Sequence, residues 1–169
     1  MTLKNVPANG QLDPQFGPDE NLFRSINPQY LYEGDRVRAA TISELSSRHP
    51  SCSFNRSKYS DPECVLSTSR PNDTEIAFVA VKDLPKNVSY SVDPTVKYSF
   101  RAQHLPENDN YSHTAVVIDK EEKEMKKFKS TDKHEILKRN LREEIALRLR
   151  LYRPGNIDSP AHTAEKSII

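Results

Sequence analysis

The stretch Ile76-Ala77-Phe78-Val79-Ala80-Val81 is apolar at every position. A strand with one face in water would alternate apolar and polar side chains, so this run predicts a strand that is covered on both faces and central in its sheet. Other segments have the β-branched and aromatic content that is typical of strands: residues 22–26, 36–42, 52–56, 96–101 and 113–118. The chain is therefore expected to build a sheet around residues 75–81.

Two helices are expected beside this sheet. A capping-box spacing at residues 60–63 includes a proline near the first helical position and predicts a short helix that runs to about Ser67. A longer helix is predicted over residues 133–152, because Asp132 and Glu135 form a capping pair and a Pro-Gly stop signal follows Arg153.

The long helix carries apolar side chains at helical spacing: Leu137, Leu141, Ile145, Leu149 and Tyr152. Leu147 and Leu151 lie outside this stripe and predict a second apolar ridge. The helix also has an excess of basic residues, so residues 133–152 are expected either to dock a protein partner or to present a solvated basic face.

Together these elements predict an α+β fold, with a mostly antiparallel sheet and a C-terminal amphipathic helix packed on it. Residues 1–20 are rich in proline and poor in apolar side chains, which predicts a flexible arm. Residues 156–169 are expected to form a flexible tail. Residues 21–155 then make up a single domain.

Composition excludes several classes of function. The four glycines leave none between positions 35 and 154, so no P-loop or dinucleotide fingerprint is present. The net charge of +1 does not by itself call for nucleic acid or a membrane. Two cysteines and the lack of a long apolar run indicate a cytoplasmic protein with reduced thiols.

Arginines on the predicted strands are the main functional lead. A guanidinium on a strand must face solvent or meet an anion, so their repetition predicts a basic cleft for a phosphate or an acidic group. The candidate ligand-binding residues are Arg24, Arg36, Arg38, Ser53, Asn55 and Arg56. Arg36 and Arg38 are expected to share one strand face. The alternative is a polar outer sheet face with arginine stems lying over apolar surface.

One histidine is a further candidate for the site. His113 begins a predicted strand after a polar loop and is a candidate proton donor or anion contact. We expect Arg24, Arg38 and His113 to converge on one anion-binding cleft. His49, Cys52, Cys64 and His104 lack the spacing of compact zinc sites, so ordinary buried thiols and no metal or cofactor are expected.

Several of these segments resemble a family of small, largely uncharacterised bacterial proteins. The resemblance covers roughly residues 21–118 and rests on the order of four blocks: Leu22-Phe23-Arg24-Ser25-Ile26, residues 36–42, the Ser-x-Asn and Tyr-Ser-x-Pro-Glu segments at residues 53–55 and 59–63, and residues 106–113. The chain is also similar to RES-type and other ADP-ribosyltransferase-like toxins that act on NAD.

The toxin resemblance implies that Arg24 contacts the dinucleotide phosphates. It also implies that Tyr59 and His113 line the pocket and that Glu63 or Glu75 serves as the acid, so His113, Tyr59 and Glu63 become the candidate catalytic residues. Two functions are therefore open. One is an interaction module from a defence or toxin–antitoxin operon that binds an acidic partner or nucleic acid; the other is an enzyme acting on NAD.

Overall fold

The computed structural model describes residues 10–46 and 50–154. The strands are β1 (Asn21–Ile26), β2 (Leu31–Tyr32), β3 (Arg36–Val37), β4 (Ser51–Arg56), β5 (Glu75–Ala80), β6 (Val88–Tyr90), β7 (Asp93–His104), β8 (His113–Lys120), β9 (Lys123–Glu124) and β10 (Arg150–Leu151). The α-helices are α1 (Pro62–Ser67) and α2 (Asp132–Arg148), and the 3-10 helices are η1 (Pro28–Tyr30), η2 (Ala39–Thr41), η3 (Ser43–Ser46) and η4 (Val81–Asp83).

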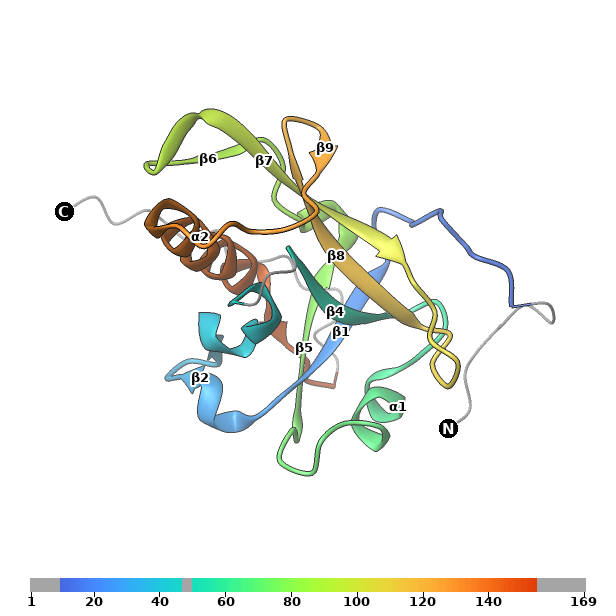
Figure 1. Cartoon of the computed structure of the whole chain (residues 1–169). Coiled ribbons are helices and arrows are strands. Elements are labelled where there is room, and N and C mark those ends of the chain that lie inside the picture. Colours follow the sequence, from blue (N-terminus) through green and yellow to red (C-terminus); the bar gives the residue numbers. More distant parts are fainter. Residues whose placement is uncertain (1–9, 47–49, 155–169) are drawn as a thin grey trace.

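The main sheet has the strand order β10-β5-β1-β4-β8-β7-β6, with β9 beside β8, and β2 and β3 form a separate hairpin (Figure 1). Every pairing between the described strands is antiparallel. With α2 packed on this sheet, the predicted α+β class is confirmed.

The two faces of the sheet are covered by different helices. On one face, α2 buries its inner stripe, including Leu141, against a large core to which Leu22 and Phe54 contribute. On the other face, Val65 of α1 packs with Phe23 and other apolar side chains of β1 and β5. The alternation of side chains along each strand is what sorts residues between these two cores.

The apolar run at residues 76–81 does form a strand that is buried on both faces, but its predicted central position is wrong. β5 is second from the edge, between β1 and the short β10. Its burial arises because α2 covers one of its faces and α1 the other. An apolar run therefore indicates that both faces of its strand are covered by other elements. It does not indicate how far the strand lies from the edge of the sheet.

The strand predicted over residues 36–42 is also wrong beyond its first two residues. After β3 the chain turns at Arg38 into η2 and then into η3. These turns bury Ile42 and Leu45 completely, in the core shared with α2. The apolar residues of this segment thus follow the spacing of helical turns that pack on α2.

The long helix begins and ends earlier than predicted. Its N-cap is Thr131, whose hydroxyl accepts a hydrogen bond from the backbone N–H of His134. It ends at Arg148, because the chain becomes extended at Leu149 and pairs Leu151 with Ala77 of β5. Strand pairing and burial of these leucines replace the last predicted turn.

This ending removes the predicted second ridge of the helix. Leu151 is buried in the sheet, whereas Leu147 is 69% exposed on α2. The short helix α1 forms and ends at Ser67 as predicted, but its N-cap is Asp61, because the hydroxyl of Ser60 donates to the carbonyl of Arg56 and the predicted capping box at residues 60–63 does not form. No helix formed by the described residues combines the length and apolar composition that crossing a membrane requires.

Residues 1–9 of the predicted arm and the whole predicted tail, residues 156–169, lie outside the described residues. Residues 10–20 are described and run along the molecule beside β7 and β8 (Figure 1). Asp13 and Glu20 contact Arg56 from this segment. These contacts, which the sequence did not predict, matter for the site described next.

Candidate functional site

Arg24 of β1 has its terminal nitrogens occupied by protein atoms. Nη1 and Nη2 donate to the two carboxylate oxygens of Glu44 at 2.6 and 2.8 Å, and they also donate to the carbonyls of Ser53 and Thr41. Burial raises the pKa of Glu44, but the hydrogen bond and charge of Arg24 outweigh it and hold that pKa below its ordinary value. Arg24 therefore ties β1 to the 3-10 segment after β3.

The expected convergence of Arg24, Arg38 and His113 is not found. Phe23 pairs with Asn55, and Asn55 pairs with His113, so these three side chains share one face of the sheet. Arg24 follows Phe23 and extends from the opposite face, toward the core under α2. Arg38 lies at the start of η2, beside the β2–β3 hairpin.

Arg56, at the end of β4, is completely buried. Its Nε donates to Glu20 at 2.6 Å, and its terminal nitrogens donate to the carbonyls of Asp13 and Gln15, both at 2.7 Å. The Phe16 ring lies 3.9 Å from the guanidinium carbon. Burial lowers the pKa of a guanidinium, but Glu20 outweighs that effect, so the pKa of Arg56 is raised.

Arg56 is one of five groove residues, which we define as Arg56, Lys58, Tyr59, His104 and Tyr111. Lys58 and Tyr59 both donate to the Asp13 carboxylate, at 2.7 and 2.6 Å. Burial opposes this charge, but these hydrogen bonds and Arg56 hold the pKa of Asp13 far below its ordinary value. Arg56, Lys58 and Tyr59 thus surround one carboxylate.

His104 and Tyr111 complete this groove. The backbone N–H of Asp13 donates to Nδ1 of His104 at 3.0 Å, so Nδ1 is the acceptor and Nε2 carries the proton. Nε2 then donates to the carbonyl of Tyr111 at 2.7 Å. The Tyr111 hydroxyl donates to the carbonyl of Gln11. His104, which the sequence analysis weighed only as a metal ligand, therefore binds the backbone of Asp13, and Tyr111 binds that of Gln11.

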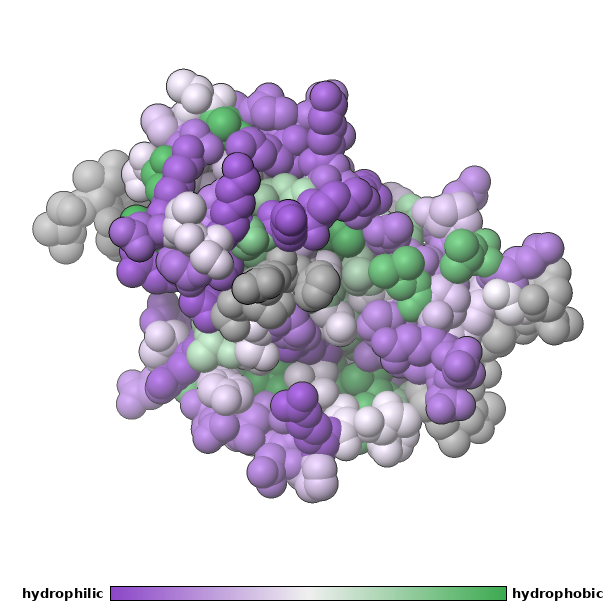
Figure 2. Space-filling model, viewed as in Figure 1, coloured by the Kyte–Doolittle hydropathy of each residue, from purple (hydrophilic) through white to green (hydrophobic). Residues whose placement is uncertain are grey.

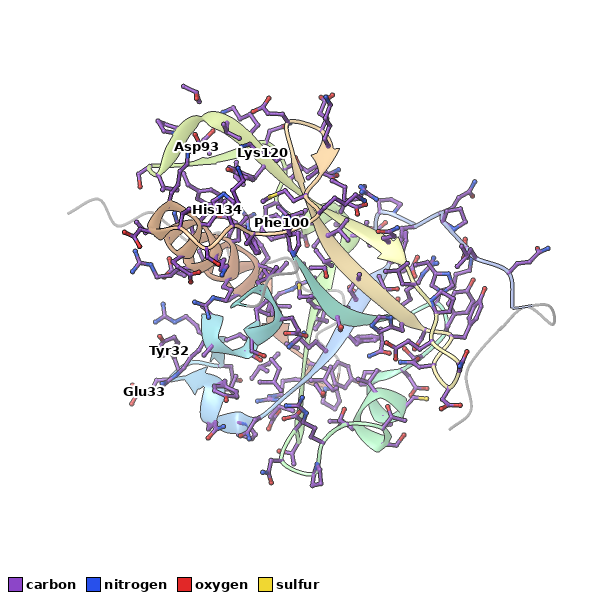
Figure 3. The ribbon with its side chains drawn as sticks, viewed as in Figure 1. Tyr32, Glu33, Asp93, Phe100, Lys120 and His134 are labelled. Atoms are coloured by element: carbon purple, nitrogen blue, oxygen red, sulfur yellow. The ribbon has the colours of Figure 1, made fainter. Side chains whose placement is uncertain are left out.

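Arg36 and Arg38 are both exposed, although Arg38 lies beyond the end of β3 and the two do not share a strand face. Both guanidiniums lie over the ring of Tyr32, at 5.6 and 4.3 Å from its centroid. Tyr32 is 50% exposed, and Figure 3 shows Tyr32 and Glu33 at the periphery of the molecule. We call Tyr32, Arg36 and Arg38 the Tyr32 surface. The sequence analysis did not single out Tyr32, although a short turn of three residues is all that separates it from Arg36.

The remaining predicted site residues are dispersed. Ser53 is exposed on β4, and its carbonyl accepts from Arg24. Asn55 binds the loop before β8, accepting from Asn110 at 2.7 Å and from Ser112 at 3.0 Å. These contacts fix the loop against the end of β4.

The candidate catalytic residues do not form a unit. His113 Nδ1 lies 2.6 Å from the carbonyl of Leu105, and Tyr59 is bound to Asp13. Glu63 is exposed in the first turn of α1. Among the described residues, no hydrogen bond, ion pair or ring contact joins any two of His113, Tyr59 and Glu63.

Both cysteines are buried and neither forms a disulfide with the other, and burial raises the pKa of Cys52 to about 12. A thiol with so high a pKa is a poor nucleophile at neutral pH. Within residues 10–46 and 50–154, no group of three or more His, Cys, Asp or Glu side chains is placed to hold a metal ion. His49 lies outside these residues.

Acid is expected to destabilise the protein, because Asp13 and Glu44 both have lowered pKa values. Each carboxylate stabilises the fold fully above its unfolded pKa of about 4, and this contribution is lost as the pH falls toward the folded-state pKa. The melting temperature should therefore drop between about pH 5 and about pH 3, and Asp13→Asn should flatten part of the drop. A melting temperature that is constant over this range would contradict the assignment.

A scan against protein-family models and searches of curated proteins and of solved structures found no match to this chain.

Proposed function

We propose that the protein is a cytoplasmic interaction module that binds an acidic patch of a protein partner through the Tyr32 surface. The observation that carries this proposal is the pair of guanidiniums held over one exposed ring. The side chain of Arg36 makes no hydrogen bond or ion pair with the described residues, and that of Arg38 uses only Nε, which donates to the carbonyl of Leu31 at 3.2 Å. Most of their donors are therefore available to a ligand.

The composition of this surface suits a protein interface. Tyrosine and arginine are the residue types that contribute most often to binding energy at such interfaces. Stacking on the Tyr32 ring restricts each guanidinium before binding, so less side-chain entropy is lost when it meets a carboxylate. A forked guanidinium also matches a carboxylate in geometry.

The charges around the Tyr32 surface favour a protein over nucleic acid. Glu33 and Asp35 lie in the same hairpin turn, and Asp35 is 3.3 Å from Arg153. A continuous phosphate backbone would meet the carboxylate of Glu33 as well as the arginines, which is unfavourable. A partner with carboxylates beside basic groups would match both signs.

A cytoplasmic location is part of the proposal and is supported by the two cysteines, which form no disulfide with each other, since the cytoplasm keeps thiols reduced. The NAD-directed alternative has less support. Its phosphate-binding residue, Arg24, has both terminal nitrogens on protein oxygens.

The test compares an Arg36→Ala/Arg38→Ala double variant with the unaltered protein. Binding of a fluorescein-labelled, Glu-rich peptide is followed by anisotropy, and the double variant should bind it about tenfold more weakly or worse. Arg139→Ala is the matched control, because Arg139 is an exposed arginine on α2, outside the Tyr32 surface. It should leave the affinity nearly unchanged.

Three outcomes would overturn the proposal. The first is equal peptide affinity for the double variant and the unaltered protein. The second is tighter binding of a single-stranded DNA oligonucleotide that is lost in the double variant, which would assign the surface to nucleic acid. The third is consumption of added NAD by the purified protein, which would favour the enzyme.

A further inference from the structure

A second surface is already occupied by the protein's own chain. We call residues 11–16 the strap, and they lie across the groove residues Arg56, Lys58, Tyr59, His104 and Tyr111. Residues 12–16 make no backbone–backbone hydrogen bond with the described residues. Side chains of the groove hold them instead, by binding the carbonyls of Asp13 and Gln15, the N–H of Asp13 and the Asp13 carboxylate.

The strap lies at the surface of the molecule. Asp13 and Phe16 are partly buried, while Leu12, Pro14 and Gln15 are exposed, with Leu12 at 65%. Figure 2 shows hydrophobic surface on the side of the molecule where this segment runs. Pro14 and Phe16 also border an open pocket of about 660 Å³, whose other lining residues include Leu84 and Phe100 and none of the groove residues. The strap is therefore a surface segment with open space along one side, unlike a strand of the core.

We propose that the groove is a peptide-binding site, filled in cis by the strap, that accepts an extended Asp-Pro-x-Phe segment of a protein partner. The groove residues bind backbone carbonyls, a carboxylate and an aromatic ring of the strap, and a segment of another protein can supply all of these groups. Arg56 binds two carbonyls that are two residues apart, Lys58 and Tyr59 bind the carboxylate, and the Arg56 guanidinium stacks on the aromatic ring. The basic groove and its acidic occupant are complementary in charge.

Release of the strap leaves no buried charge unpaired. Arg56 keeps Glu20, which accepts from Nε at 2.6 Å and from Nη2 at 3.0 Å and lies outside the strap. The backbone at Pro18 and Glu20 is fixed to η4, because their carbonyls accept from Lys82 and Val81. Residues 11–16 can thus move about Gly17 while the counter-charge stays in place.

The strap competes with any incoming peptide at an effective concentration on the order of millimolar, since it is joined to the groove by a short linker. The chain has no tryptophan, so Phe16→Trp places a single fluorescent reporter on the strap. A synthetic peptide of residues 10–17 is the probe. Its addition should shift the tryptophan emission to the red, with a midpoint at roughly 1 mM peptide.

A reciprocal substitution separates exchange from a fixed structural role. Asp13→Ala in the protein weakens the strap and should lower the peptide midpoint about tenfold or more, whereas the same change in the peptide should abolish the effect. Asp19→Ala is the control, because Asp19 pairs with Lys82 outside the strap. Anisotropy of a labelled peptide on the Asp13→Ala protein repeats the test without the tryptophan.

The proposal is overturned if the emission stays constant up to several times the expected midpoint and the labelled peptide fails to bind the folded Asp13→Ala protein. The strap would then be a permanent part of the fold. A red shift that depends on protein concentration alone, without peptide, would assign the groove to the strap of a second copy and would overturn the partner assignment.

Discussion

Arg56→Ala is expected to lower the free energy of unfolding by about 3–5 kcal/mol, because removing one partner of a buried ion pair leaves the other charge uncompensated. The charge left behind is that of Glu20, whose side chain is only 9% exposed. The carbonyls of Asp13 and Gln15 lose their donors as well. Urea unfolding followed by circular dichroism measures the change.

Arg148→Ala provides the matched control for this prediction. Arg148 also forms an ion pair, with Nη2 3.1 Å from Glu144 one helical turn away, but the two side chains are 45% and 20% exposed. Water screens such a pair, so its loss should cost about 1 kcal/mol or less. Equal losses for the two variants would show that burial does not set the contribution of Arg56.

Leu141→Asp is expected to lower the free energy of unfolding by about 3 kcal/mol or more, because it places a carboxylate where no solvent or partner reaches it. Leu141 is completely buried between α2 and the sheet. Leu147→Asp makes the same chemical change on the same helix at a side chain that is 69% exposed. It should alter stability by about 0.5 kcal/mol at most.

Thermal melts of the two variants check this prediction. An unchanged melting temperature for Leu141→Asp would mean that this face of α2 is not part of the core. A large drop for Leu147→Asp would mean that the outer face of α2 is covered.

The parts of the fold that sequence patterns predicted correctly are those with local causes. Asp61 and Pro62 mark the start of α1 by chemistry within one turn. β1 and β4 have the composition of strands and lie within a residue of their predicted limits. The end of α2 was not predictable in this way, because the pairing of Leu151 with Ala77 joins residues that are far apart in sequence.

The candidate site shows the same limit. The arginines on the strands correctly predicted that buried guanidiniums have anionic partners, but those partners are carboxylates of the same chain. Glu44 satisfies Arg24, and Asp13 and Glu20 satisfy Arg56. No local pattern connects these pairs, since the carboxylates lie in a 3-10 helix and in a segment whose composition is typical of disorder. Of the four candidate arginines, Arg36 and Arg38 are the two that are exposed.

The pairing of β10 with β5 has a consequence for the newly made chain. About seventy residues separate Ala80 from Arg150, so β5 is synthesised long before the strand that borders it. During this interval one side of an apolar strand has open backbone groups, which is a hazard for association with other chains. The short β10 therefore covers this edge of β5 only after residues 150–151 have been synthesised, and until then the backbone groups of Ala77 and Phe78 on that side lack their strand partner.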